Sequence, residues 1–208
     1  MINIAVLVSG GGTNLQALID AEKKGIIRSG KIALVISNKS DAYALERAAN
    51  NGIETAVVSK KEYTTQESFE DRISELLTEK GIDIIVLAGF MCILSERFTS
   101  RYPERIINVH PSLIPSFCGK GFYGLHVHEA ALAKGVKVSG ATVHIVTPEC
   151  DAGPIVLQKA VEVKEGDTPE ILQRRIMEEA EWRILPEAVR LFCEDRITVA
   201  DNRVSIKE

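Results

Sequence analysis

The stretch "INIAVLVSGGGTNLQALIDAEKKG", residues 2–25, decides the fold class of this chain. Its continuous apolar run, 2–9, lacks the alternation of a half-exposed strand and predicts a strand buried on both faces. Three glycines then form a turn, and residues 14–25 have the apolar spacing of a helix that ends at a glycine. A buried strand that leads directly into a helix is typical of an α/β protein with a parallel sheet.

Strand and helix signals keep alternating through the first half of the chain. Each apolar run precedes a stretch with helical spacing, and helices that join strands in this way cover the faces of a parallel sheet. The apolar runs predict strands at 31–38, 53–60, 82–90 and 105–110, and the amphipathic stretches predict helices at 42–52 and 65–81.

The last third of the chain predicts an antiparallel addition to this sheet. Residues 138–147 alternate between apolar and polar, and 154–163 form another β-prone run after a turn at "CDAGP". The expected fold class is therefore α/β, with a doubly wound, mostly parallel, Rossmann-like sheet that ends in antiparallel C-terminal strands.

One long helix and a hairpin are expected to close the chain. Residues 168–196 have helical spacing behind a Thr168 cap, and Pro186 should kink or divide this helix. Two short β-prone pieces flank Asp201 and Asn202, which predicts a terminal hairpin.

The composition predicts the number of domains and disfavours some kinds of partner. The 208 residues are 45% hydrophobic and 26% charged, without repeats or an evident linker, so we expect a single domain over 1–208. The net charge of −4 and a pI near 5.7 disfavour nucleic acids and anionic membranes as partners. No apolar run approaches the roughly 18 residues of a membrane helix.

The cysteines and the N-terminal run indicate a compartment. The apolar start continues into the glycine turn and is expected to be a strand and not a signal peptide. The four cysteines are scattered and form no C-x-x-C pair. We therefore expect reduced thiols in a cytoplasmic protein.

The glycine turn, "SGGGTNLQ" at 9–16, joins a strand to a helix, where backbone N–H groups can bind an anion. A nucleoside-triphosphate loop would need G-K-[ST], and a dinucleotide loop would need a glycine at position 15, where Leu15 stands. Two interpretations of the glycine turn remain. Gly12, Thr13 and Asn14 form a cradle for a monophosphate, or the glycines only make a tight turn.

A second polar cluster is expected where "NVHPSLIPSF" follows an apolar run. Asn108 and His110 are two residues apart and point the same way on a strand. Asp151 follows the strand that carries His144, and Gly10, Asn108 and Asp151 all fall at strand ends, where open α/β sheets bind ligands. An amide, an imidazole and a carboxylate without a good nucleophile indicate oxyanion stabilisation and proton transfer, with Asp151 keeping His110 charged.

Several stretches resemble one known family. "VLVSGGGTNLQALI" (6–19), "LAGFM" (87–91), "NVHPSLIPSF" (108–117) and "SGATVHIVTPECDAGPIVLQ" (139–158) are similar to the formyltransferases that use 10-formyltetrahydrofolate. Within them, the opening stretch and the length resemble the members that act in purine synthesis. The resemblance covers nearly the whole chain. It implies a Rossmann-like formyltransferase fold and transfer of a formyl group from folate, as cosubstrate, to the amine of glycinamide ribonucleotide, with no metal.

The resemblance also implies a set of site residues. The half 1–100 would mainly bind the substrate phosphate, and the half 101–208 would mainly hold the catalytic and folate-binding groups. The two small molecules would be the partners, with a homodimer compatible with the sequence. The matched positions are the catalytic Asn108, His110 and Asp151; Gly12, Thr13, Asn14, Glu178 and Glu181 for the ribotide; Met91, Cys92, Ile93, Leu94, Val146 and Asp151 for folate; and His144 behind the catalytic residues.

Two departures from the family pattern concern folate. Gln66 and Cys92 stand where members often have arginines, and neither offers an arginine's grip on the carboxylates of the folate tail. Lys120, in a loop longer than in some relatives, is a candidate replacement. We expect the glycine-rich loop 118–129, within the segment 115–129, to act as a lid over folate.

The sequence is also compatible with other kinds of site and other activities. His126, His128 and Cys118 lie close enough in sequence for a metal site, although the spacing is weak evidence for one. A formyltetrahydrofolate hydrolase would be expected to carry a domain before the first strand, and a tRNA formyltransferase an RNA-binding domain after the last helix. A non-catalytic nucleotide- or folate-binding module would not need Asn108, His110 and Asp151 together.

Overall fold

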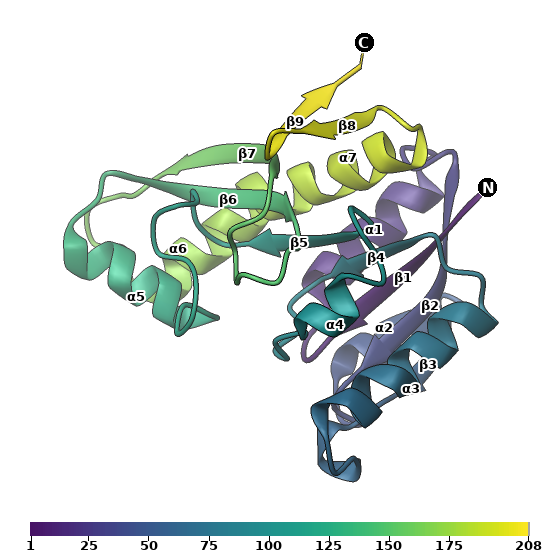
Figure 1. Cartoon of the computed structure of the whole chain (residues 1–208). Coiled ribbons are helices and arrows are strands. Elements are labelled where there is room, and N and C mark those ends of the chain that lie inside the picture. Colours follow the sequence, from purple (N-terminus) through teal and green to yellow (C-terminus); the bar gives the residue numbers. More distant parts are fainter. Residues whose placement is uncertain (208) are drawn as a thin grey trace.

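A seven-stranded sheet forms the centre of the structure, a computed structural model that describes residues 1–207 (Figure 1). The strand order is β3-β2-β1-β4-β5-β6-β7. The pairs from β3 to β5 are parallel, whereas β6 is antiparallel to both β5 and β7. The strands are β1 (Ile2–Val8), β2 (Gly30–Ser37), β3 (Glu54–Val57), β4 (Ile84–Leu87), β5 (Ile106–His110), β6 (Val138–Ile145) and β7 (Ile155–Glu162).

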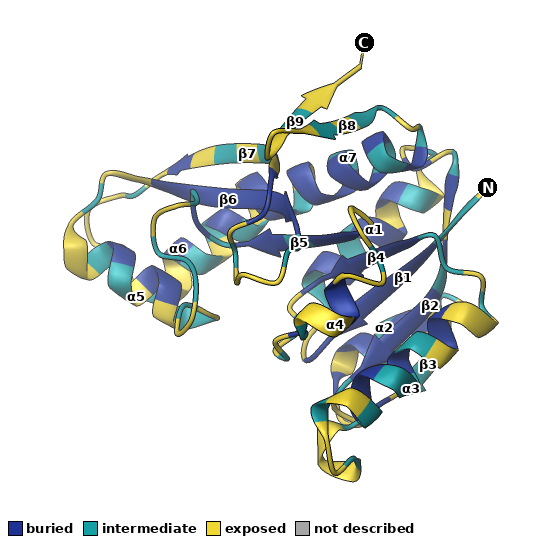
Figure 2. Ribbon diagram, in the orientation of Figure 1, coloured by how far each residue is buried: buried dark blue, intermediate teal, exposed yellow. Residues whose placement is uncertain are grey.

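Helices cover both faces of this sheet, which confirms the expected fold class. Alternate residues of β1 enter two separate cores: Ile4 and Val6 pack with α1, α2 and α7, and Leu7 packs with α3 and α4. This two-sided burial explains the continuous apolar run, and β1 and β4 in the middle of the sheet are mostly dark blue in the burial view (Figure 2). The helices are α1 (Thr13–Lys23), α2 (Tyr43–Asn50), the 3-10 turn η1 (Lys60–Glu62), α3 (Gln66–Glu79), α4 (Glu96–Thr99), α5 (Leu125–Lys134), α6 (Pro169–Ile176), η2 (Met177–Glu181) and α7 (Trp182–Cys193).

The C-terminal helix is divided, but at a different residue from the one expected. Thr168 caps α6 by accepting a hydrogen bond from the backbone N–H of Ile171, as predicted. Pro186 lies inside α7, and the helix widens upstream of it into the π-helical turn η2. Proline cannot donate to the carbonyl four residues earlier, which is that of Trp182, and its ring crowds that carbonyl. The π-helical turn ends at Glu181, next to the Trp182 carbonyl that Pro186 crowds.

The chain ends in the predicted hairpin, formed by β8 (Ile197–Ala200) and β9 (Arg203–Ile206). Asp201 and Asn202 occupy its two turn positions with φ values of 49° and 58°. Left-handed residues at both positions match the twist of the paired strands.

Two helices were not expected. The short helix α4 follows the loop after β4, and α5 begins at Leu125 inside the stretch predicted to be a mobile loop. The prediction of a loop is therefore wrong for residues 125–129, which are helical, whereas closure of the segment over folate stays a prediction. Gly135 ends α5 in the left-handed conformation typical of a helix terminus.

In the described part of the chain, residues 1–207, no helix combines the length and the hydropathy that a bilayer crossing requires.

Candidate functional site

The candidate catalytic residues meet where β5 and β6 run side by side. Asn108 and His110 lie on β5 and point to the same side, as their spacing predicts. In the antiparallel register, Asn108 lies opposite His144 and His110 lies opposite Thr142. Residues in such cross-strand positions have neighbouring side chains, so the sheet itself brings the amide and the second imidazole together.

His144 fixes the orientation of the Asn108 amide. Nδ1 of the buried His144 ring lies 3.0 Å from the carbonyl oxygen of Ile145 and donates to it. The other ring nitrogen, Nε2, lies 3.2 Å from Nδ2 of Asn108, which donates to it. One N–H of Asn108 is thereby used, and the second N–H remains available to a bound molecule.

His110 is held as a neutral imidazole in the protein alone. Its Nε2 lies 2.9 Å from the carbonyl oxygen of Phe117 and donates to it. Burial lowers the pKa of His110 below its usual value, although the Phe117 carbonyl and the charge of Asp151 oppose this effect. The expectation that Asp151 keeps His110 charged is therefore not met before substrates bind. The free position is Nδ1, which lies 3.6 Å from Oδ2 of Asp151.

Asp151 lies in the turn between β6 and β7 with a left-handed φ of 55°. Burial alone would raise the pKa of its carboxyl. The contact with His144, the charge of His110 and the N–H of Gly119 together lower this pKa to about 2. Gly119 donates to Oδ2 at 2.8 Å, and Nε2 of His144 lies 3.5 Å from Oδ1. Asp151 is therefore an anion between two imidazoles.

Gly153 allows the Asp151 turn to lie against β6. A Cβ atom at position 153 would come within 1.9 Å of the carbonyl oxygen of Ile145. A larger residue would push the turn away from the strand and move Asp151 with it. The three residues predicted to be catalytic are thus brought together by the β5–β6 register and by this turn.

The glycine loop lies at the end of β1 and leads into α1. Gly12 is the N-terminal cap of α1 with φ of 71°, and a Cβ atom there would lie 2.6 Å from Cβ of Ala44. The hydroxyl of Thr13 faces Sδ of Met177 at 3.6 Å. Nδ2 of Asn14 donates to Oε2 of Glu181 at 2.6 Å.

The two acidic residues predicted to bind the ribotide face different environments. Glu181, in η2, is 6% exposed, and burial raises its pKa to about 7 against the opposing hydrogen bond from Asn14. Glu178 is exposed and pairs with Arg174 at 2.8 Å. The structure therefore brings Glu181 to the glycine loop and leaves Glu178 on the outer surface. The amide oxygen of Asn14 is buried without a partner among the described residues.

The predicted folate-binding residues come from the loop after β4 and from the end of β6. Met91 and Ile93 are 54% and 64% exposed, which leaves two apolar side chains open to a ligand. The thiol of the half-buried Cys92 accepts a hydrogen bond from Asn38 at 3.0 Å. Leu94 differs, because its side chain is 6% exposed and packs in the core. Val146 is partly buried against the same core.

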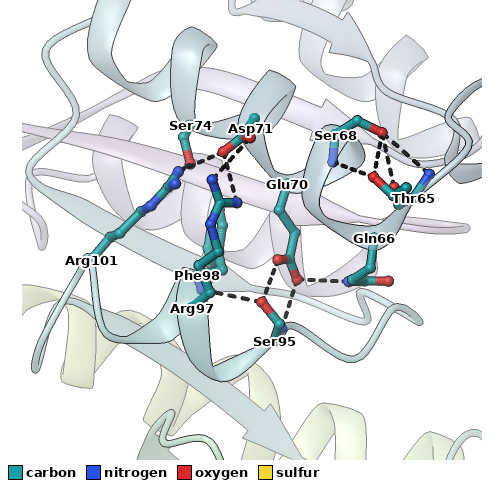
Figure 3. A network of polar contacts seen from close by, with 10 residues as sticks. All are labelled: Thr65, Gln66, Ser68, Glu70, Asp71, Ser74, Ser95, Arg97, Phe98 and Arg101. Carbon is teal, nitrogen blue, oxygen red and sulfur yellow. Dashed lines mark hydrogen bonds and ion pairs between the residues drawn. The ribbon is translucent and has the colours of Figure 1, made fainter.

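A buried carboxylate anchors this loop to α3 (Figure 3). Glu70 is fully buried and accepts hydrogen bonds from the backbone N–H and the hydroxyl of Ser95. Gln66 donates to Glu70 at 2.6 Å and to the carbonyl oxygen of Ile93 at 3.2 Å. Gln66 therefore holds the loop and is not directed to a ligand.

The histidines considered for a metal site point apart. His126 is exposed on α5 and pairs with Glu129 at 3.0 Å, whereas His128 is fully buried. Burial lowers the pKa of His128 to about 4. Their positions on the helix do not let both histidines bind one ion, and within residues 1–207 no group of His, Cys, Asp and Glu side chains has the arrangement of a metal site.

Sequence reasoning missed three residues that contact the candidate site. Phe117 and Gly119 supply a carbonyl and an N–H to His110 and Asp151 from the loop before α5. Because these are backbone groups, side-chain chemistry gives no signal for them. Arg47 of α2 donates to the carbonyl of Gly11 in the glycine loop. Its sequence context is that of an ordinary surface helix.

Comparisons with known proteins agree with this geometry. Residues 2–189 match the family described as formyl transferase. The chain is 43% identical over 202 residues to a phosphoribosylglycinamide formyltransferase of Haemophilus influenzae, covering 97% of this chain and 92% of that protein. A crystal structure of glycinamide ribonucleotide transformylase 1 from Symbiobacterium toebii superposes with a TM-score of 0.94 at 46% identity, covering 100% of this chain and 95% of that one.

Longer proteins also contain a similar segment. The chain is 44% identical over 199 residues to the human trifunctional purine biosynthetic protein adenosine-3, which covers 96% of this chain. The chain spans 19% of the length of that relative.

Proposed function

Because the chain belongs to the formyl transferase family, we propose that it transfers a formyl group from 10-formyltetrahydrofolate to the amine of glycinamide ribonucleotide, a step of purine biosynthesis. The observation that carries this proposal is the continuous polar network of Asn108, His144, Asp151 and His110 where β5 and β6 run side by side. It offers an amide donor, a proton-accepting imidazole and a carboxylate within one site.

Asn108 is assigned to the oxygen of the formyl group. When the amine attacks the formyl carbon, this oxygen gains negative charge, and the second N–H of Asn108 is available to donate to it. His144 keeps the amide in this orientation before the reaction begins. Such a donor acts mainly in the transition state, and losing one typically costs about 10²–10³ in rate.

His110 and Asp151 are assigned to proton transfer. The amine loses a proton as it forms the new C–N bond, and the folate nitrogen gains one as it leaves. Neutral His110 has a free acceptor at Nδ1, and a proton bound there would lie between the ring and the Asp151 carboxylate. The anion would stabilise the imidazolium as it forms. No covalent intermediate with the protein is required.

The glycine loop is assigned to the ribotide, which makes the half 1–100 the main phosphate-binding part and the half 101–208 the main catalytic part. The backbone N–H groups at the start of α1 suit a phosphate. The amide oxygen of Asn14, which has no partner within residues 1–207, and the carboxyl group of Glu181 are acceptors, and they suit the hydroxyl groups of a ribose.

The loop after β4 is assigned to folate. The exposed side chains of Met91 and Ile93 give an aromatic ring system two apolar surfaces, and the loop is fixed by Glu70 and Gln66. Gln66 and Cys92 are both engaged in neutral contacts, which leaves the charge of the folate tail to other residues. Folate supplies the formyl group when it is bound, and the protein residues position it and move protons.

The two small molecules are the proposed partners, in a cytoplasmic protein with free thiols at all four cysteines. Neither nucleic acid nor a membrane is part of the proposal, in keeping with the net charge of −4.

A formyl-transfer assay tests the proposal against the hydrolase alternative. The protein is incubated with 10-formyltetrahydrofolate in the presence and the absence of glycinamide ribonucleotide, and formylated ribotide and released tetrahydrofolate are both measured. We expect the two products in equal amounts, and little tetrahydrofolate without the amine. Equal folate release without the amine would identify a hydrolase, and release in neither reaction would identify a binding module.

A further inference from the structure

We propose that Arg47 of α2 is a positioning residue for the phosphate cradle, because it holds the glycine loop in the conformation that presents backbone N–H groups to the ribotide. This role deepens the proposed function and rests on it for the identity of the ligand. The geometry itself comes from two hydrogen bonds between α2 and the loop and from two contacts that hold the Arg47 side chain in place.

Two successive carbonyl groups of the glycine loop are held by α2. Nε of Arg47 donates to the carbonyl oxygen of Gly11 at 2.8 Å. The backbone N–H of Ala44, in the first turn of the same helix, donates to the carbonyl oxygen of Gly10 at 3.0 Å. Both loop carbonyls are therefore turned toward α2.

This arrangement determines where the loop N–H groups point. In a trans peptide the C=O of one residue and the N–H of the next point in opposite directions. The N–H groups of Gly11 and Gly12 consequently point away from α2. Among the contacts of residues 1–207, the N–H groups of Gly11, Gly12, Thr13 and Asn14 have no protein acceptor. Successive free N–H groups at a helix start form an anion-binding concavity.

Arg47 is itself held in place on both sides of this contact. Its guanidinium lies over the ring of Tyr43, 4.9 Å from the ring centroid. Nη1 donates to Oε1 of Gln16 at 3.2 Å. Arginine presents its donors in one rigid plane, so a single side chain can connect α2, the loop carbonyl and the second turn of α1.

A buried polar group indicates a ligand at the loop and not only a tight turn. Asn14 is 9% exposed, its Nδ2 is used by Glu181, and its Oδ1 has no partner in the described residues. An acceptor left in this state favours a bound molecule with a donor beside the cradle, as a ribose 5-phosphate has.

The alternative is that Arg47 only fastens α2 to α1. In that case its loss would lower stability and leave ligand binding unchanged. If it orients the cradle, its loss frees the Gly11 carbonyl to rotate, and the phosphate-bearing substrate binds less tightly while the chemical step is preserved.

The test compares Arg47→Ala and Arg47→Lys with a matched control. Arg28→Ala removes an arginine whose Nε also donates to a loop carbonyl, that of Gly25 at 2.9 Å, but beyond the other end of α1. Each protein is assayed for KM and kcat with the ribotide varied, and for binding of ribose 5-phosphate and of unphosphorylated ribose by calorimetry. The melting temperature of each variant is recorded.

For Arg47→Ala we expect a KM for the ribotide raised about tenfold and an equal loss of ribose 5-phosphate affinity, as for one charge-assisted hydrogen bond. We expect kcat within about twofold of wild type, and no change in either quantity for Arg28→Ala. Arg47→Lys should recover only part of the affinity, because one ammonium group cannot reproduce the planar set of contacts.

Unchanged KM and phosphate affinity in Arg47→Ala would overturn this role, and so would full recovery in Arg47→Lys, which would assign the effect to charge alone. If Arg47→Ala does not fold, the phosphate affinity and the KM of Arg47→Lys test the role of Arg47 instead. If the wild-type protein does not transfer the formyl group but its phosphate affinity depends on Arg47, the proposed reaction is refuted. The proposed role of Arg47 in phosphate binding would then still stand.

Discussion

Replacing Asp151 by asparagine removes the anion between His110 and His144 while keeping the size of the side chain. The carboxylate lies 3.6 Å from Nδ1 of His110 and 3.5 Å from Nε2 of His144, and it accepts from Gly119. An asparagine oxygen can still accept from Gly119, but it cannot stabilise an imidazolium. We expect kcat for formyl transfer to fall by at least about 10²-fold, as for the loss of other preorganised electrostatic partners.

The same substitution has a calculable effect on stability. The pKa of Asp151 falls from 3.8 to about 2 in the folded protein. A lowered pKa gives stability that is present above the unfolded value and is lost as the pH falls through the folded value. The difference corresponds to about 2 kcal/mol at neutral pH, which disappears between about pH 4 and pH 2. The free energy of unfolding of Asp151→Asn should lack this contribution and its dependence on acidic pH.

Turnover is measured by product mass spectrometry, and unfolding by urea titration at several pH values. Glu149→Gln is the matched control, since Glu149 is an exposed residue of the same turn. A folded Asp151→Asn protein with turnover within about tenfold of wild type would refute the assignment of the carboxylate to the chemistry.

The remaining predictions concern the other residues of the site. Asn108→Ala should lower kcat about 10²–10³-fold with little change in KM, because its free N–H acts on the developing oxyanion; a changed KM alone would contradict this. The His110 ring should titrate below its usual pKa by NMR, and lower still in Asp151→Asn, because the carboxylate opposes the effect of burial; a pKa above the usual value would refute the neutral assignment. Glu181→Gln should be more stable than wild type by up to about 3 kcal/mol near pH 8, and this gain should vanish near pH 4. The reason is that a carboxyl group whose pKa is raised to about 7 in the folded protein contributes stability that is lost as the pH rises through that value. Equal urea midpoints of the two proteins near pH 8 would count against this prediction. Gly12→Ala should lose about 1–3 kcal/mol and bind the ribotide less tightly, because it combines a positive φ with a Cβ only 2.6 Å from Ala44; Gly25→Ala, with φ of 68° and open space, is the control, and equal losses of ribotide affinity in both variants would contradict the close-contact explanation.

Local sequence patterns predict the central part of the fold because they report burial directly. The run in β1 is apolar at every core position because Ile4 and Leu7 face opposite cores, and the two-residue spacing of Asn108 and His110 places both on one side of β5. The strand-end rule does not place Asp151 near them, because β6 is antiparallel to β5 and Ile145, at the end of β6, lies opposite Ile107 at the start of β5. Asp151 reaches His110 and His144 from the turn that follows β6.

Other features depend on tertiary contacts that a local pattern does not contain. Glycines before Leu125 and the H-x-H spacing obscure the start of α5, although the glycine at 135 is a recognisable helix end. Pro186 predicts a disturbance in the last helix, but the π-helical turn lies where Met177 and Glu181 contact the glycine loop. The protonation of His110 depends on its burial and on its hydrogen bond with the Phe117 carbonyl, which residue types alone do not report.

The most direct measurement is a crystal structure with glycinamide ribonucleotide and a 10-formyl folate analogue that cannot release its formyl group. We expect the formyl oxygen within about 3.2 Å of Nδ2 of Asn108, the amine on the side of His110 and Asp151, and the phosphate on the N–H groups of the glycine loop. A formyl group bound more than about 6 Å from Asn108, well beyond hydrogen-bond reach, would contradict the proposed site.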